Sequence, residues 1–420
     1  MMTLRNFLDE QDFIPWPALV YVTGMINYGG RVTDDLDRRL LMSILAKYYN
    51  PDVLDDSYKL TPSGVYRVPQ EGDLSLYQEY IRGLPITDTP DIFGMHDNAT
   101  LQFEMQESKK VVDVVLSIQP QVSSAGGGKT SEEIVADLAK EIEEKMPRIL
   151  DRENASKEKD PFAITESGMA NSLGTVLGQE MDRFNKLILV VRKSLKDIQM
   201  AIQGTIVMSG DLDLMFTRML NNQVPALWER YAYPSLKPLA GWVKDFLERV
   251  EFMDRWLCDG EPNSFWLSGL FFPQGFLTGA LQNHARKTQI AIDRLNFGFN
   301  MSSVTDVAEL GGQPENGIYI HGLYLVCAQF DLEKKMLIES SPGSMFAELP
   351  VIHFEPVENY NPPTENYECP LYKTSVRAGV LSTTGQSTNY VLNMSIPIHP
   401  DTDPDFWILQ GTAGLCALDD

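Results

Sequence analysis

The strongest hydrophobic pattern in the chain runs from residue 177 to residue 202. Apolar side chains recur there in alternating steps of four and three, at Leu177, Met181, Phe184, Ile188, Val191, Leu195, Ile198 and Ile202. Such steps return a side chain to the same face of an α-helix. The pattern therefore predicts one long helix that packs against partners on one side, and a shorter seam from Val243 to Leu257 predicts another.

The first 85 or so residues have the boundary signals of a small helical unit. Pro15 opens an apolar-rich helix, and a glycine pair beginning at Gly29 ends it. Thr33 is placed to cap a second helix whose first turn is acidic. Residues 60–95 are rich in proline, glycine and tyrosine, which predicts an irregular connection.

Residues 100–290 are predicted to be mostly helical. Thr130 and Glu133 have the spacing of a capping box, and Pro147 should end the helix that follows. The charged run from Asp151 to Asp160 predicts an exposed loop.

The pattern changes after about residue 295. Short β-branched and aromatic runs follow at Gly317–Asp331, Val351–Phe354, Tyr390–Ile396 and Trp407–Leu418, separated by glycine, proline and asparagine. This spacing is typical of a small antiparallel barrel or sandwich. Helices followed by strands predict an α+β fold and not a parallel α/β sheet.

One segment, Ser264–Lys287, combines bulky rings with glycines. It carries Phe265, Trp266, Phe271, Phe272 and Phe276 around three glycines. Pro273 suits the first turn of a helix. The segment has no carboxylate and no cysteine, and His284 is its only titratable base. It is therefore expected to bury its rings and to determine shape, not to perform catalysis.

Composition narrows the functional classes. The protein has 420 residues, of which 43% are hydrophobic, and 35 basic against 58 acidic residues give a net charge of -23. This charge opposes binding to nucleic acid and to anionic lipid. The cysteines at 258, 327, 369 and 416 lack CxxC spacing, which favours reduced thiols in a cytosolic protein. Neither a signal-peptide core nor a membrane-spanning run is evident.

The segment Ser123–Thr130 ends like a phosphate-binding loop. The pattern GxxxxGK[ST] requires a glycine where this protein has Ser123. The apolar run ahead of it, Val111–Ile118, has helical rather than strand spacing, and no Walker-B acid follows. An exposed turn is therefore favoured over a nucleotide site.

No other constellation predicts chemistry. The histidines at 96, 284, 321, 353 and 399 lack metal-binding spacing, and no GxSxG elbow is present. The acidic residues of Asp34–Asp37 lie beside arginines and are explained by capping and ion pairing. We therefore predict no catalytic, cofactor-binding or metal-binding residue.

Several long stretches resemble one family. Tyr21–Leu41 resembles the helical lid of the sixth AAA+ module of dynein heavy chains, and Ser264–Lys287 resembles the hallmark of their C-terminal domain. Further matching stretches are Ile92–Asn98, Ser123–Lys129, Val224–Trp256, Gly317–Val357 and Tyr367–Leu418. The ending is similar to axonemal members and not to the cytoplasmic transport motor.

The resemblance implies three units: a helical lid over residues 1–90, a helical part over 91–295 and a small β-barrel over 296–420. It implies a non-catalytic C-terminal fragment of a minus-end-directed microtubule motor. Such a fragment would help close the AAA+ ring and modulate force and processivity in ciliary or flagellar beating. ATP and magnesium would bind upstream modules, so no cofactor is expected here.

The resemblance also implies partners and a location. The expected partners are the preceding AAA+ modules of the same heavy chain. Intermediate chains, light chains and microtubules would be reached only through the full-length motor, and neither nucleic acid nor membrane is expected. The location would be the cytoplasm, on the cytoskeleton of the axoneme.

Two alternatives stay open at the level of sequence. The protein could be a stand-alone β-barrel module that binds a peptide or a sugar, or an NTP-binding domain that uses Ser123–Thr130. An exposed aromatic groove on the barrel would favour the first. An exposed apolar surface over residues 1–120 would instead favour a fragment of a ring.

Overall fold

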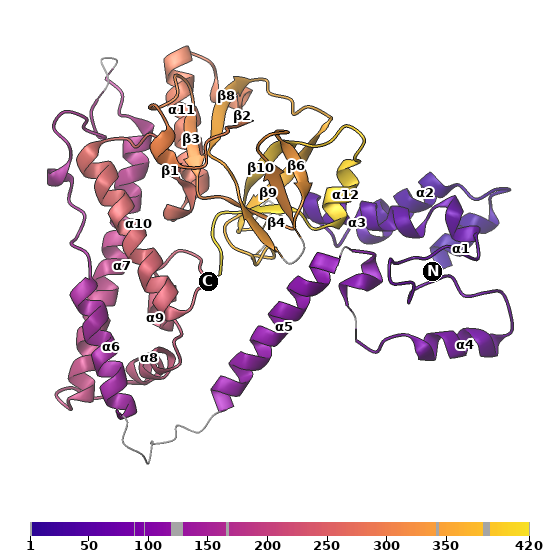
Figure 1. The fold of residues 1–420 in the computed structure, drawn as a ribbon, viewed down its shortest axis with the longest axis horizontal. Coiled ribbons are helices and arrows are strands. Elements are labelled where there is room, and N and C mark those ends of the chain that lie inside the picture. The colour runs from indigo at the N-terminus through magenta and orange to yellow at the C-terminus, as the bar shows by residue number, and fades with distance from the viewer. Residues whose placement is uncertain are drawn as a thin grey trace.

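The computed structural model describes residues 2–87, 89–95, 97–118, 129–164, 168–341, 344–380 and 387–419. The N-terminal helices lie at one end of the molecule, the β-sheets in the middle and the long helices α6, α7 and α10 at the other end (Figure 1). Helix α5 crosses between the two ends as a separate rod (Figure 1).

The N-terminal part is helical, as expected. Its helices are α1 (Met2–Asp9), α2 (Trp16–Tyr21), the π-helix η1 (Val22–Tyr28), α3 (Asp35–Tyr48), the short 3-10 helix η2 (Pro51–Leu54), α4 (Leu74–Gly83), η3 (Pro90–Phe93) and α5 (Asp97–Ile118). The predicted start after Pro15 and the predicted end at Gly29 are confirmed.

Two details of the N-terminal prediction were wrong. The cap of α3 is Asp34 and not Thr33, because the Asp34 carboxylate accepts hydrogen bonds from the backbone N–H groups of Leu36 (2.8 Å) and Asp37 (3.2 Å). A carboxylate also suits the positive end of the helix dipole. The stretch 60–95 is not wholly irregular, since it contains α4.

The middle of the sequence forms a helical layer. It contains α6 (Ser131–Lys145), η4 (Arg152–Asn154), α7 (Ser172–Ile202), α8 (Gly210–Leu220), α9 (Ala226–Glu229), α10 (Leu239–Asp259) and α11 (Pro273–Thr288). The long seam on α7 is confirmed, with every predicted position buried except Ile202, which is half-buried. The capping box of Thr130 and Glu133 is also confirmed. None of the described helices is long and apolar enough to cross a membrane.

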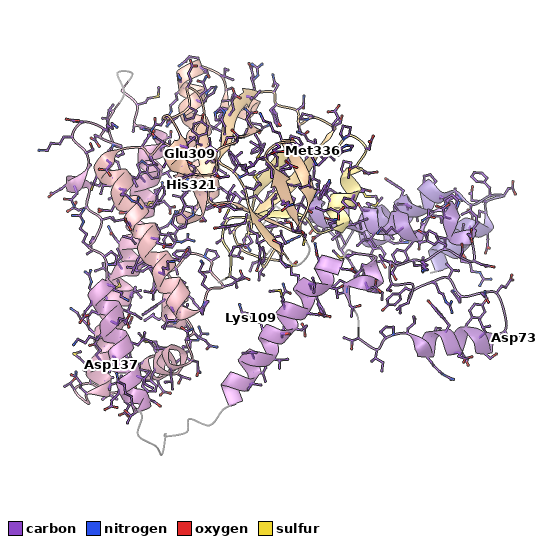
Figure 2. The ribbon with its side chains drawn as sticks, in the orientation of Figure 1. Asp73, Lys109, Asp137, Glu309, His321 and Met336 are labelled. Atoms are coloured by element: carbon purple, nitrogen blue, oxygen red, sulfur yellow. The ribbon has the colours of Figure 1, made fainter. Side chains whose placement is uncertain are left out.

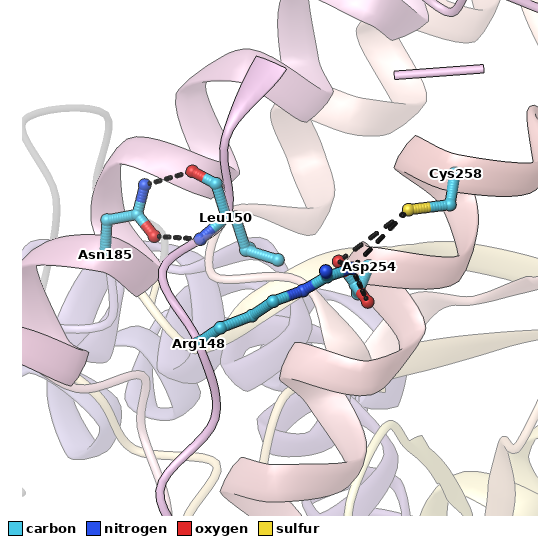
Figure 3. Close-up of polar contacts among 5 residues, drawn as sticks. All are labelled: Arg148, Leu150, Asn185, Asp254 and Cys258. Carbon is cyan, nitrogen blue, oxygen red and sulfur yellow. Dashed lines mark hydrogen bonds and ion pairs between the residues drawn. The ribbon is translucent and has the colours of Figure 1, made fainter. Parts of the chain in front are cut away.

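The extended segment that follows α6 and contains Arg148 and Leu150 is fixed to α7 and to α10 (Figure 3). Leu150 exchanges two backbone hydrogen bonds of 2.8 Å with the Asn185 side chain of α7. Arg148 pairs with both carboxylate oxygens of Asp254 on α10, at 2.9 and 3.0 Å. The Cys258 thiol lies beside this pair, 3.8 Å from the Arg148 guanidinium (Figure 3). The segment therefore holds α6, α7 and α10 in one layer.

The last third of the sequence holds most of the strands. They are β1 (Phe265–Trp266), β2 (Leu295–Met301), β3 (Ile318–His321), β4 (Tyr324–Val326), β5 (Ala328–Asp331), β6 (Met336–Glu339), β7 (Phe346–Glu348), β8 (Ile352–Glu358), β9 (Asn366–Tyr372), β10 (Tyr390–Pro397) and β11 (Ala413–Leu415), with η5 (Leu267–Gly269), η6 (Ile292–Arg294), η7 (Val307–Glu309) and α12 (Pro404–Leu409) between them. Together with the helices they confirm an α+β fold.

The strands form three sheets, with the orders β1-β3-β8-β2, β10-β9-β11-β4-β7 and β5-β6. Within the described residues none of these sheets closes on itself, so the small barrel is not confirmed. The sheets are also mixed and not purely antiparallel, because β1 pairs parallel to β3 and β11 pairs parallel to β9.

The predicted strand Trp407–Leu418 was wrong in its first part. Asp403 caps a helical turn by accepting a hydrogen bond from the Asp405 N–H at 2.9 Å, and Pro404 occupies the first helical position. Only Ala413–Leu415 is a strand. The resulting helix, α12, packs against α3 of the N-terminal part. Nearby, Arg39 donates a hydrogen bond to the Glu368 carbonyl of β9 at 2.9 Å. The N-terminal helices are thus attached to the sheets.

Candidate functional site

The aromatic segment Ser264–Lys287 is anchored by a buried carboxylate from α7. Glu180, whose side chain is 1% exposed, accepts hydrogen bonds from the backbone N–H groups of Phe271 (2.6 Å) and Phe272 (3.2 Å). Arg183 pairs with the same carboxylate at 2.5 Å. Burial raises the pKa of Glu180, and these three donors act against that rise. Glu180 thereby fixes the start of α11 to α7.

The rings of this segment are not equally buried. Phe276 is completely buried, with ring centroids 4.8 Å from Phe265 and 6.2 Å from Trp256. Phe272 is 46% exposed, so the expectation that all these rings are buried was wrong for it. The Phe272 ring lies over Gly275, where an added Cβ would approach it to 2.3 Å. The glycine is thus needed for the ring's position.

Beneath this segment lies a buried charge network that sequence reasoning missed. Arg249 of α10 pairs with Asp245 at 2.6 Å and donates a hydrogen bond to the Ser268 carbonyl. Its guanidinium carbon lies 3.7 Å from the centre of the Tyr233 ring. Lys237 approaches Asp245 at 3.9 Å. The available signal was the i, i+4 spacing of Asp245 and Arg249, which is common on exposed helices as well.

The phosphate-loop candidate is only partly within the described residues, because Ser123–Gly128 lie outside them. At its end, the Lys129 ammonium lies 2.5 Å from the Asp137 carboxylate, which raises the pKa of Lys129. The Thr130 hydroxyl accepts the Glu133 N–H at 3.2 Å as the helix cap. The two described residues of the motif are therefore engaged in starting α6.

The histidines have structural contacts. His321 Nδ1 is hydrogen-bonded to the Ser264 hydroxyl at 2.8 Å, and burial lowers the pKa of His321 to about 4. His353 Nε2 is bonded to the Asn316 carbonyl at 2.7 Å. His96 lies outside the described residues. Across the described parts of the sequence, no group of three or more His, Cys, Asp or Glu side chains could hold a metal ion.

Exposed apolar side chains are concentrated in the N-terminal part. Of the 36 large apolar side chains that are exposed among the described residues, 20 lie in residues 2–118, where only Leu19, Leu45 and Tyr66 are buried. Ile86, Phe13 and Ile26 are the most exposed examples on the connecting segments and η1, at 102%, 70% and 62%. This part also has an apolar cavity of about 710 Å³ along α3. Exposed apolar side chains are thus more frequent in this part than in the rest of the described residues.

Comparison with known proteins agrees with this picture. Residues 105–416 match the family described as the C-terminal domain of dynein heavy chains, and residues 1–99 match the AAA lid domain of dynein heavy chains. The protein belongs to the dynein heavy chain family.

Its relatives include several axonemal heavy chains. The sequence is 45% identical to dynein axonemal heavy chain 6 of Homo sapiens over 100% of its own length, and 46% identical to dynein axonemal heavy chain 1 of the rat, Rattus norvegicus, over 99%. It is 43% identical to human dynein axonemal heavy chain 3 over 100% of its length. It spans only 9–10% of the length of these relatives.

Proposed function

We propose that the protein is the non-catalytic C-terminal part of an axonemal dynein heavy chain. Its N-terminal helices dock on the preceding AAA+ modules of the same heavy chain and help to close the ring. The observation that carries this proposal is the concentration of exposed apolar side chains in residues 2–118. Burying such surface against a neighbouring module gives a strong drive for association. The match of residues 1–99 to an AAA lid supports that neighbour.

The proposal assigns a role to each of three units. Residues 1–90 form the lid, residues 91–295 form a helical scaffold, and residues 296–420 form a β-rich unit. The last two modulate the force and processivity of a minus-end-directed microtubule motor in the axoneme of cilia or flagella. ATP and magnesium bind upstream modules, and microtubules, intermediate chains and light chains interact only with the complete motor.

The alternatives from the sequence are less well supported. A stand-alone peptide- or sugar-binding module would not explain why both family models together cover nearly the whole sequence. An NTP-binding domain would need Lys129 for phosphate, and this ammonium is paired with Asp137. Neither alternative is proposed.

The proposal is tested in the full-length heavy chain with the double variant Tyr21→Ser/Ile26→Gln. Both side chains are exposed here, at 56% and 62%, so the 420-residue variant alone should melt at the wild-type temperature. In the full motor, microtubule gliding and microtubule-stimulated ATPase should both fall several-fold, because the lid loses apolar contact with its neighbour. The matched control is Leu189→Gln, which changes a 52% exposed position of α7. A motor with wild-type gliding and ATPase would refute docking through this surface.

A further inference from the structure

A cavity of about 680 Å³ lies between α8, the segment that leads to α10, and α5. It is lined by three cations, Lys109, Arg218 and Lys237, and by one carboxylate, Glu229. The lining thus has an excess of two positive charges, which is unusual in a protein whose net charge is -23. The cavity is therefore a local basic site that the sequence analysis did not detect.

Two of the three cations are poorly neutralised. Arg218 pairs with Glu229 at 2.8 Å, which leaves Lys109 and Lys237. Lys237 is only 19% exposed and lies 3.9 Å from Asp245, but that carboxylate pairs more closely with Arg249, at 2.6 Å. Because Arg249 and Lys237 share one carboxylate, a net positive charge remains beside the cavity.

The Lys109 ammonium comes from a different part of the molecule. It donates a hydrogen bond to the Leu236 carbonyl at 3.5 Å, and no carboxylate among the described residues pairs with it. Lys109 lies in the C-terminal half of α5, the helix that crosses between the two ends of the molecule (Figure 2). The cavity thus joins α5 to the segment between α8 and α10.

The Tyr233 side chain also lines the cavity. It is 4% exposed, and its hydroxyl is buried beside the Asp245–Arg249 pair. Burial raises the pKa of Tyr233 well above its usual range, so the hydroxyl stays neutral and adds no negative charge to the lining.

We propose that this cavity binds a phosphate-bearing anion through Lys109 and Lys237. A phosphate group near neutral pH carries close to two negative charges and several acceptor oxygens. It therefore matches the net positive charge of the lining. Because Lys109 belongs to α5, the bound anion also ties α5 to the helical layer.

Calorimetric titration of the protein with inorganic phosphate and with pyrophosphate, at constant ionic strength, tests the binding. Saturable binding to one site is expected. Lys237→Gln should weaken it at least about tenfold, because a charge-assisted hydrogen bond is lost. Lys244→Gln removes the same charge from a 79% exposed position of α10 and should change nothing. Thermal melts confirm that each variant is folded.

Two results would overturn the proposal. One is the lack of saturable binding up to about 10 mM phosphate or pyrophosphate. The other is an equal loss of affinity in Lys244→Gln and Lys237→Gln, which would indicate general screening of charge. Succinate, a dicarboxylate, provides the test of ligand class, since equally tight binding of succinate would refute the assignment to phosphate.

Two further measurements address the source of the phosphate and the role of α5. Tighter binding of O-phosphoserine than of inorganic phosphate would assign the cavity to a phosphorylated side chain, and the reverse order would assign it to free phosphate compounds. Pyrophosphate should slow amide hydrogen exchange in residues 97–118 of the wild-type protein and not of Lys109→Gln. Unchanged hydrogen exchange in the wild type would refute the proposal that the bound anion ties α5 to the helical layer.

Discussion

At the scale of single residues, several polar side chains in this protein have their properties set by burial. The Ser264 hydroxyl holds one ring nitrogen of His321, and the side chain lies at the end of β3 beside the aromatic segment. Burial disfavours the charged imidazolium, which is why the pKa of His321 falls to about 4. A histidine held neutral in the folded state makes stability depend on pH.

Burial of His321 should make the protein less stable in acid. In the unfolded state His321 binds a proton below about pH 6.5, and in the folded state only below about pH 4. Its stabilising contribution is therefore present above pH 6.5 and is lost as pH falls from 6.5 towards 4, by up to about 3 kcal/mol. Urea denaturation of wild type and His321→Gln across this range should show a smaller decrease in unfolding free energy for the variant. His399→Gln, at an exposed position, should keep the wild-type decrease. Equal decreases in all three proteins would contradict the prediction.

Sequence alone did not predict which aromatic rings of the segment Ser264–Lys287 are buried. Phe272 and Phe276 lie four residues apart in one aromatic segment, yet one is 46% exposed and the other is completely buried. The difference depends on Glu180, which binds the backbone at Phe272 and comes from a helix about 90 residues earlier in the sequence. Local sequence carries no information on that contact, so the segment could be recognised but its buried rings could not be separated from the exposed one.

At the scale of elements, the periodic seam and the capping box were reliable signals, whereas the single cap predicted at Thr33 was wrong by one residue. The α7 seam and the Thr130 capping box were both predicted, because each depends on spacing within one helix. The α12 helix was mistaken for strand, since its few apolar residues suit either structure and only the Asp403-Pro404 start distinguishes them. Strand spacing predicted a small antiparallel barrel or sandwich, and the family resemblance implied the barrel, but spacing does not determine how strands pair.

The α7 seam leads to a prediction on stability. Leu187 is fully buried and Leu189, two positions later on the same helix, is 52% exposed. Leu187→Ala should lower the free energy of unfolding by about 2–5 kcal/mol, because it removes buried methyl groups and leaves a cavity. Leu189→Ala should change it by less than about 0.5 kcal/mol. Urea denaturation measures both. Similar losses for the two variants would mean that α7 packs on both faces.

At the scale of the whole molecule, the two ends of the protein differ in how many apolar side chains they expose. Residues 2–118 expose most of the large apolar side chains that are exposed among the described residues, whereas α7 and α10 bury most of theirs in a shared core with the sheets. The proposed docking on a neighbouring module uses the exposed end. This asymmetry, rather than any constellation of reactive groups, is what fits the membership in the dynein heavy chain family.

The response of the whole protein to ATP separates this role from that of a nucleotide enzyme. A phosphate loop needs its lysine for the β- and γ-phosphates and its threonine hydroxyl for magnesium. Here Lys129 is paired with Asp137, and the Thr130 hydroxyl accepts a helix-capping hydrogen bond. The protein should therefore release no phosphate from Mg-ATP, and Lys129→Ala should leave the calorimetric heat on adding ATP unchanged. Any such heat should instead disappear in Lys237→Gln, because the basic cavity beside α5 can hold the phosphates of ATP. ATP hydrolysis, or binding that is lost in Lys129→Ala and retained in Lys237→Gln, would show that the segment Ser123–Thr130 is a nucleotide site after all.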